Sequence, residues 1–264
     1  MSNAVATMTV MCTSFVIAWS ILAGSGHAAI DPEAIVAIWT FDEGRGEDVK
    51  DVSGNGNDGV VLGKPRWVNG KFGTALSLDG QGNVVQIDQF GNVAPTKEVT
   101  ITIWVFVHGV KNQDLLSFDP LIGVNRITIH WPWNEDIVWQ HGTDQHNCVI
   151  RWNDEFKGNW EFWAFVGSTK GNYLRIFRNM EEVCLREDAP EAKPAFKTSP
   201  QTWNIGGRRG SSVEAIIDEV GVFNAPLSNE DLTRSMEKGL EGAAFSVSPA
   251  DKMAALWGRI KARI

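Results

Sequence analysis

Residues 99–107 read Val-Thr-Ile-Thr-Ile-Trp-Val-Phe-Val. Successive side chains of a β-strand point to opposite faces, so the five aliphatic residues at odd positions share one face. The other face carries two threonines together with Trp104 and Phe106, so both faces are at least partly covered. This pattern predicts a central strand of a two-sheet sandwich.

Short apolar runs separated by turn residues continue the pattern on both sides of this stretch. No helical pattern lies between them, and the 26 glycines and 10 prolines suit a fold with many turns. The sequence therefore predicts an all-β, two-sheet antiparallel sandwich. The other expected strands span residues 35–39, 75–78, 84–87, 127–130, 160–166, 174–177 and 216–223.

Helical signals occur only near the C-terminus. Ser228 can cap a helix over 229–238, which Gly239 would end. A second short helix is expected from Ser248, and apolar residues recur at helical spacing over 253–264. This amphipathic tail could dock on its own domain, or it could bind a partner or a membrane surface.

The first 29 residues contain no Lys, Arg, Asp or Glu, and their apolar run leads into small residues. We interpret residues 1–29 as a secretory signal peptide, with retention as an uncleaved anchor as the alternative. The apolar run is shorter than the roughly 20 residues of a membrane span, so no span is expected in the mature chain. The expected division is a signal peptide, one domain over 30–240 and a helical tail over 241–264. The protein is then secreted, periplasmic or on the cell surface.

The charge balance argues against nucleic acid as a partner. The formal net charge is -8, with a pI near 5.2, which offers no general attraction for a phosphate backbone.

Cys148 and Cys184 remain as an even pair once the leader, with its own cysteine, is removed. In an oxidising compartment they can form a disulfide, or they can be two separate buried thiols.

The stretch Asp51-Val52-Ser53-Gly54-Asn55-Gly56 places oxygen ligands at alternate positions with glycine at the sixth, as calcium loops do. Leu62 stands where such a loop has its final glutamate, so other ligands would have to come from elsewhere in the fold. The alternative is a tight hydrogen-bonded turn without metal. The candidate metal ligands are Asp42, Asp51, Asp58, Asp79 and Asp218.

Several of the 12 tryptophans lie in or beside turn-rich segments near carboxylates and amides. Flat aromatic faces stack on sugar rings while polar side chains bind the hydroxyls, so these residues are candidates for carbohydrate binding. The alternative is that they cover the sheet as part of the core. The candidates are Trp131, Trp133, Trp139 and Trp152.

Four motifs together resemble the laminin-G-like branch of the concanavalin-A-like lectin/glucanase jelly rolls. They span residues 39–44 with 51–59, then 70–80, 205–207 and 217–228, and the resemblance covers most of the chain from 35 to 240. It implies a jelly roll whose first and last strands are neighbours. It also implies a calcium ion on the rim or convex face, and it brings Asp42 and Asp218 together.

The chain departs from this family at two positions. Met180 stands in a hairpin turn where glycine is usual, which argues against a turn that needs positive φ, and Phe162 replaces the common histidine. The closely spaced Glu-x-Asp-x-x-Glu strand of the glucan hydrolases is absent from the sequence, which disfavours hydrolysis. The expected function is a secreted, non-catalytic module that binds carbohydrate or another extracellular ligand. The alternatives are an adhesion or structural protein with a protein partner, and a polysaccharide-active enzyme with an unfamiliar site.

Overall fold

A computed structural model describes most of the chain between residues 30 and 245. The predicted signal peptide, the second helix and the amphipathic tail lie outside the described residues. In the described part, no helix is both long and apolar enough to cross a membrane. The described residues are 30–88, 90, 97–109, 113–119, 126–133, 135–142, 147–187, 202–208 and 211–245.

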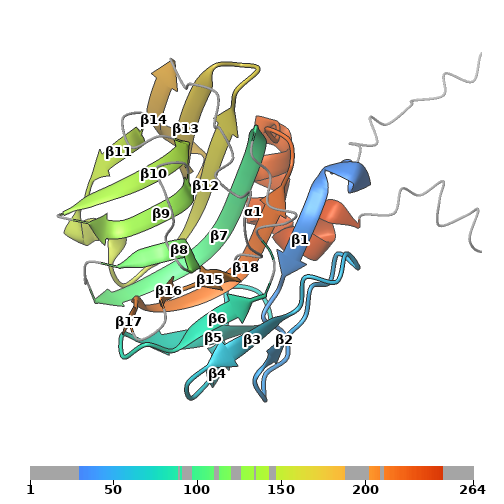
Figure 1. Ribbon diagram of the computed structural model, residues 1–264, viewed down its shortest axis with the longest axis vertical. Helices are drawn as coiled ribbons and strands as arrows, with labels where there is room; N and C mark the ends of the chain where they lie inside the picture. The colour runs from blue at the N-terminus through green and yellow to red at the C-terminus, as the bar shows by residue number, and fades with distance from the viewer. Residues whose placement is uncertain are drawn as a thin grey trace, which may run out of the picture.

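Two antiparallel eight-stranded sheets form the layers of a sandwich (Figure 1), which confirms the predicted all-β fold. Sheet A has the order β14-β13-β12-β7-β18-β5-β4, with β1 also paired to β18, and sheet B has the order β11-β10-β9-β8-β15-β6-β3-β2. Sheet A comprises β1 (Ile35–Trp39), β4 (Arg66–Asn69), β5 (Thr74–Asp79), β7 (Glu98–Gly109), β12 (Trp160–Ser168), β13 (Tyr173–Arg178), β14 (Glu181–Glu187) and β18 (Glu214–Phe223). Sheet B comprises β2 (Asp48–Val49), β3 (Gly59–Leu62), β6 (Val84–Ile87), β8 (Asp114–Asp119), β9 (Arg126–Trp133), β10 (Asp136–Gly142), β11 (Asn147–Arg151) and β15 (Thr202–Ile205). The remaining elements are the pair β16 (Gly207–Arg208) and β17 (Ser211–Ser212), the short helices η1 (Pro32–Ala34) and η3 (Asp154–Phe156), and α1 (Asn229–Ala244).

Strand β7 lies in the interior of sheet A, between β12 and β18. Its odd-numbered aliphatic side chains join the core between the sheets, as Ile103 and Val105 do. The even-numbered Trp104 is buried on the other face, under α1, where Leu232 packs in the same cluster. The prediction of a strand covered on both faces is confirmed.

The first and last strands of the domain pair with each other. Strand β1 runs antiparallel to β18, and Trp39 lies opposite Val220. This is the neighbour relation that the family resemblance implies.

A disulfide joins the two sheets at one edge of the sandwich. Cys148 lies on β11, the edge strand of sheet B, and Cys184 lies on β14, the edge strand of sheet A. Their sulfur atoms are 2.04 Å apart, so of the two interpretations of the cysteine pair the structure has the disulfide.

Helix α1 begins as predicted and ends later than predicted. Ser228 Oγ accepts a hydrogen bond from the Asp231 amide at 3.1 Å, which confirms the N-cap. Gly239 leaves the helical conformation with φ at 72°, but a further turn follows and runs to Ala244. The Glu219 carboxylate accepts a hydrogen bond from the Leu240 amide, so a strand residue caps the restarted helix. The expected boundary at residue 240 therefore falls inside α1.

Candidate functional site

The structure places two of the four candidate tryptophans in the core. Trp131 is 2% exposed and Trp139 is 0% exposed. Both join the cluster between the sheets, and the Trp131 ring lies 4.9 Å from that of Trp163. A sugar cannot stack on rings enclosed in this way, so the prediction of ligand binding is wrong for these two residues.

Trp152 is the candidate tryptophan whose described side chain remains partly exposed. It packs edge-on against Trp131 and Phe156, at centroid distances of 6.0 and 5.3 Å. Its indole nitrogen donates to Asp154 Oδ1 at 3.2 Å. Trp133 lies on β9, but its side chain is outside the described part of the chain.

The predicted calcium loop is built around Asp51 as a network of hydrogen bonds. Asp51 Oδ1 accepts from the amides of Ile38 and Ser53, and Oδ2 accepts from the amide and side-chain nitrogens of Asn57, all at 3.0 to 3.2 Å. Asp58 pairs with Lys50 at 2.7 Å. These carboxylate oxygens organise the turn itself, as the metal-free alternative predicts.

Asp42 and Asp218 meet at another loop, over residues 70–74. Asp218 Oδ2 accepts from the amides of Lys71 and Phe72 at 2.8 and 3.0 Å, and Asp42 Oδ1 accepts from the Thr74 amide at 2.8 Å. The loop must approach closely, because a Cβ atom at Gly73 would lie 1.9 Å from Asp42 Oδ1. The two aspartates therefore come together as the resemblance implies.

Burial dominates the electrostatics of this loop. It raises the pKa of Asp218 to about 7, against the lowering effect of the two amide donors, and the neighbouring Asp42 raises it further. Burial likewise raises the pKa of Glu219 to about 8. The second oxygen of Asp218, Oδ1, is buried and has no hydrogen-bond partner.

The five candidate aspartates do not gather into one metal centre. Asp79 Oδ1 accepts from the Gln81 amide in a separate turn. Among the described residues, no group of three or more His, Cys, Asp or Glu side chains could hold a metal ion. The five predicted aspartates therefore lie in separate turns, and only Asp42 and Asp218 share a loop.

Five polar side chains form a straight line across the outer face of sheet B, and we call them the polar row. The register places Gln140 opposite Thr128, and Asn204 opposite both Ser117 and Gln86. Thr128 and Ser117 are neighbours because the next residues, Ile129 and Leu116, pair directly. At the usual strand separation the row is about 19 Å long. Its members in order are Gln140, Thr128, Ser117, Asn204 and Gln86.

Two members of the polar row have unsatisfied hydrogen-bonding groups. Asn204 is 1% exposed, and neither its Oδ1 nor its Nδ2 has a partner. Thr128 is 0% exposed, and its Oγ1 has none. Buried polar groups are almost always hydrogen-bonded in native proteins, so these atoms are available to a ligand or a water molecule.

A buried ionic cluster lies next to the polar row. Asp114 is 0% exposed, and its two carboxylate oxygens contact His130 Nδ1 and Arg208 Nε. The other ring nitrogen of His130 lies 3.4 Å from Gln140 Oε1. Through His130, the cluster connects Asp114 and Arg208 to the end of the row.

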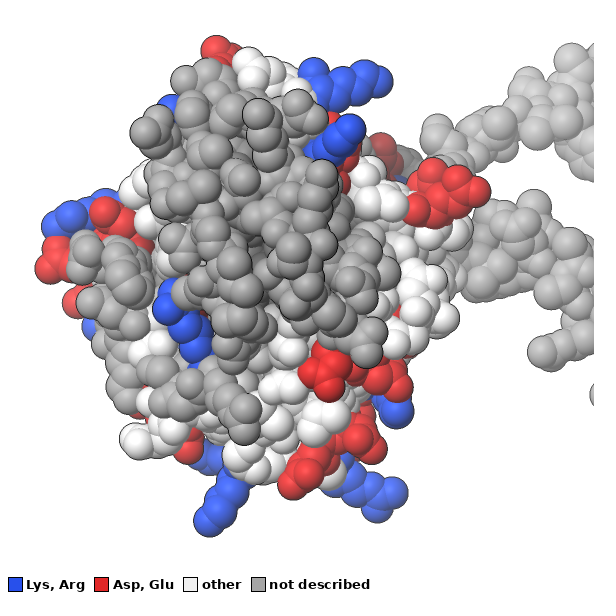
Figure 2. Space-filling model, in the orientation of Figure 1, with Lys and Arg blue, Asp and Glu red and all other residues white. Residues whose placement is uncertain are grey.

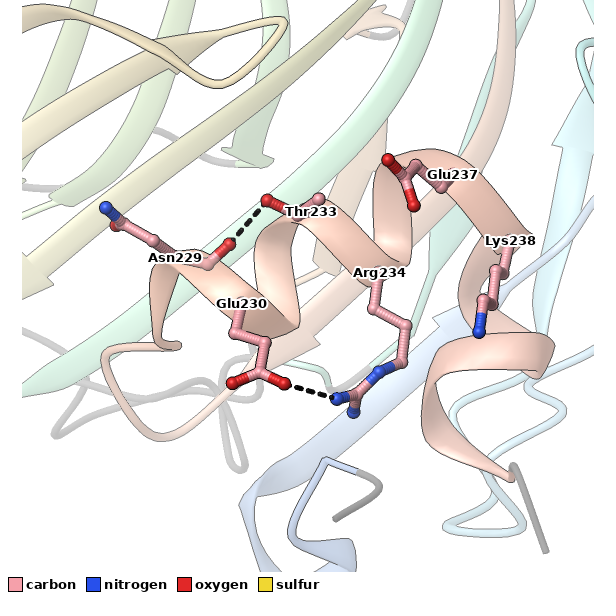
Figure 3. A pocket seen from close by; sticks show the side chains of 6 residues that line it. All are labelled: Asn229, Glu230, Thr233, Arg234, Glu237 and Lys238. Carbon is pink, nitrogen blue, oxygen red and sulfur yellow. Dashed lines mark hydrogen bonds and ion pairs between the residues drawn. The ribbon is translucent and has the colours of Figure 1, made fainter. Parts of the chain in front are cut away.

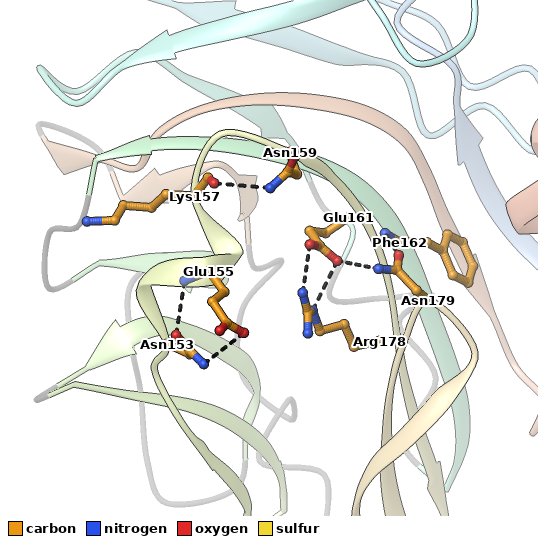
Figure 4. Close-up of polar contacts among 8 residues, drawn as sticks. All are labelled: Asn153, Glu155, Lys157, Asn159, Glu161, Phe162, Arg178 and Asn179. Atoms are coloured by element: carbon orange, nitrogen blue, oxygen red, sulfur yellow. Dashed lines mark hydrogen bonds and ion pairs between the residues drawn. The ribbon is translucent and has the colours of Figure 1, made fainter.

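Two further clusters have internal partners. In Figure 4, the buried Glu161 accepts two hydrogen bonds from Arg178, at 2.8 and 3.0 Å, and one from Asn179. Figure 3 shows a hollow of about 390 Å³ on one side of α1, where Arg234 lies 3.3 Å from Glu230. All of the lining residues of this hollow come from α1 itself, so it is the surface of a single helix.

The sequence analysis did not identify the polar row. The alternation in residues 127–130 places Thr128 and His130 on the face opposite Ile127 and Ile129, which was a usable signal. The strand around Asn204 alternates in the same way, but it lies 76 residues further along the chain. Only the pairing of β8 with both β9 and β15 brings these side chains into one line.

A comparison with known protein families shows which family this chain belongs to. The profile of the concanavalin A-like lectin/glucanases superfamily matches residues 79–233, more than half of the chain. The chain belongs to this superfamily. A search of curated protein sequences finds no match.

Solved structures with a similar fold come from several kinds of protein. Domain 4 of AbnA, an extracellular arabinanase from Geobacillus stearothermophilus, was solved with arabinotriose; it is 18% identical with a TM-score of 0.53, covering 76% of this chain and 97% of that one. The receptor-binding domain of botulinum neurotoxin C/D mosaic serotype is 13% identical with a TM-score of 0.60, covering 77% and 51%. Trypanosoma rangeli sialidase with sialic acid is 13% identical with a TM-score of 0.56, covering 80% and 34%. The chain thus spans about half of the toxin domain and a third of the sialidase, and at these identities the likeness shows the fold alone.

Proposed function

We propose that this protein is a non-catalytic carbohydrate-binding domain whose ligand lies along the polar row of sheet B. The observation that carries the proposal is Asn204, a buried amide whose donor and acceptor groups are both without partners. An amide of this kind suits a sugar, because each hydroxyl can donate one hydrogen bond and accept another. The solved arabinanase domain that contains arabinotriose adds support at the level of fold.

The exposure of the row indicates how a ligand would enter. Gln86 is half-buried. Val60, which lies opposite Gln86 on the neighbouring strand β3, is 44% exposed. Ser117, Thr128 and Gln140 at the other end are buried. Asn204 is equally buried, so a chain end entering past Gln86 can reach it only when the side chains that cover the row move aside.

The carboxylates near the row support binding without catalysis. Asp114 is engaged by His130 and Arg208, and Asp88 Oδ1 accepts from Gln86 Nε2 at 2.8 Å. Glycoside hydrolysis generally requires two carboxyl groups on either side of the scissile bond, one of them free to transfer a proton.

The charge distribution favours a ligand of low charge over a polyanion. The net charge is -8. Among the described residues on the face in Figure 2, basic and acidic side chains are interspersed around the edge and do not separate by sign. Such a surface provides no steering field for a polyanion.

A glycan microarray followed by calorimetry tests this proposal. Thr128→Val and Asn204→Leu remove the unpartnered groups and keep the number of side-chain heavy atoms, and we expect affinity to fall roughly 5- to 150-fold. Thr102→Val is the matched control, because Thr102 is a buried threonine of sheet A whose hydroxyl also has no partner. Glycan binding that survives both row variants would refute the site, and binding to proteins without any glycan would favour the adhesion alternative.

We also propose export and a bound calcium ion. The Cys148–Cys184 disulfide supports an oxidising compartment. The orphaned Asp218 Oδ1 beside Asp42 supports a calcium ion at the 70–74 loop. A calcium ion bound only to the folded state would raise the melting temperature, so a melt with and without chelator tests the metal. An unchanged melting temperature would contradict the proposal of a bound calcium ion.

A further inference from the structure

A second line of side chains crosses the outer face of sheet A, and we call it the aromatic row. Register pairs connect its members across five strands, from β4 through β5, β18 and β7 to β12. All but one of them are half-buried, and Arg66 is exposed. The members in order are Arg66, Ser77, Ile216, Phe106 and Trp160.

Helix α1 covers the adjacent line of sheet A and stops short of this one. Leu232 of α1 packs in one cluster with Trp104 and Phe162, which are fully buried there. Two residues further along the same strands, Phe106 and Trp160 are only partly buried, with their ring centroids 5.9 Å apart. Sheet A therefore presents an aromatic pair to solvent beside the edge of the helix.

A hollow of about 640 Å³ adjoins the aromatic row and is lined by polar side chains. Its cations are Lys64 and Arg66, its carboxylates are Asp79 and Glu214, and His108 lies 5.1 Å from the Phe106 ring. In the described part of the chain, the side chains of Lys64, Arg66 and Glu214 have no hydrogen-bond or ion-pair partner.

We propose that the aromatic row and this hollow form a second carbohydrate site, for a neutral oligosaccharide. The rings of Phe106 and Trp160 offer flat apolar surface for the C–H faces of a sugar. The unpartnered guanidinium, ammonium and carboxylate groups supply donors and acceptors for hydroxyls within the same hollow. The charges of the two cations and the two carboxylates cancel, so the lining has no net charge that would attract an anionic ligand.

The second site is independent of the polar row and lies on the opposite outer face of the sandwich. The two sheets and the core separate the two faces, so one short oligosaccharide cannot occupy both sites. The protein with both sites filled would bridge two glycan chains. Two linked sites also raise the apparent affinity for a surface that displays many chains.

Nuclear magnetic resonance can observe this site separately from the polar row. The probes are arabinotriose, cellotriose, xylotriose and mannotriose, titrated into the full chain, with trigalacturonic acid as the charged comparison. We expect at least one neutral trisaccharide to shift the indole signal of Trp160 and the backbone signals of His108 and Glu214. Trp160→Ala should weaken this binding about tenfold or more.

Exposed-residue variants keep the test valid if Trp160→Ala folds poorly. Arg66→Ala removes one unpartnered donor of the hollow, and Arg45→Ala is its control because Arg45 is exposed and outside the lining. We expect Arg66→Ala to weaken binding several-fold and Arg45→Ala to leave it unchanged.

The outcomes separate this inference from the proposed function. Shifts at Trp160 that persist in Asn204→Leu support the second site, whatever happens at the polar row. Shifts confined to the polar row overturn the second site and leave the proposed function standing. Binding of trigalacturonic acid alone, self-association through this face, or no shift at Trp160 with any trisaccharide would also overturn it.

Discussion

Replacing Asn204 with leucine should stabilise the unliganded protein while it weakens glycan binding. The side chain is 1% exposed, and both of its polar atoms lack partners. A buried polar group without a hydrogen bond costs about 1 to 3 kcal/mol relative to a satisfied one. Leucine has a similar shape and no polar atoms, so it removes this cost without opening a large cavity.

The expected gain is about 1 to 3 kcal/mol in the free energy of unfolding. For a domain of this size, each kcal/mol raises the melting temperature by roughly 2 to 4 °C. Urea unfolding and differential scanning calorimetry, both without ligand, measure the two quantities. A residue that lowers stability and raises affinity is the expected pattern at a binding site.

The matched control is Asn83→Leu. Asn83 is also buried, but its Oδ1 accepts from the Asp79 amide and from Ser212 Oγ, each at 3.1 Å. Leucine at this position leaves the Asp79 amide and the Ser212 hydroxyl without their acceptor, so it should lower the free energy of unfolding by about 1 to 3 kcal/mol. If Asn204→Leu destabilises the protein as Asn83→Leu does, the Asn204 amide is satisfied in solution and the reasoning from its missing partners is refuted.

Three further predictions follow from the fold. Replacing Cys148 or Cys184 with serine opens a 36-residue loop and should lower stability by about 3 to 4 kcal/mol in urea unfolding; a loss under 1 kcal/mol would contradict the cross-link. In the folded protein the pKa of Asp218 is about 7 and that of Glu219 is about 8, whereas both groups titrate near pH 4 when the chain is unfolded. The free energy of unfolding, measured in chelator, should therefore fall as the pH rises from about 4 to about 8. The slope should reach about 1.4 kcal/mol per pH unit for each group, and Asp218→Asn should flatten it; a rising slope would reverse the assignment. Ser228→Ala should cost about 1 kcal/mol through the lost helix cap, whereas an unchanged midpoint in urea would show that the cap contributes nothing.

The strands were predictable because their signal is local. Alternation over residues 99–107 identified β7 and its two covered faces, and the motifs at both ends of the domain implied the β1–β18 pair. At Met180, where the family usually has glycine, the residue still adopts a positive φ of 69°. Neighbouring Asn179, also at positive φ, is held by hydrogen bonds to Glu161 and Phe162.

The candidate site was harder to predict because composition does not reveal which face of a strand meets the other sheet. Trp131 and Trp139 have the chemistry of sugar-binding residues, but they point between the sheets. The residues that alternate with them on β9 and β10, His130 and Gln140, occupy the outer face. Nearby carboxylates and amides in the sequence suggested the opposite assignment.

The sequence by itself determined the strand content, the antiparallel sandwich, the helix start at Ser228 and the meeting of Asp42 with Asp218. The first three follow from local patterns in the sequence, and the last is what the resemblance to the family implies. Only the tertiary structure decided that Asn204 joins Thr128 in one row and that α1 leaves Phe106 and Trp160 uncovered. Strand pairing is set by the sum of many contacts between distant segments, so the line of residues across a sheet does not exist until the whole sandwich has formed.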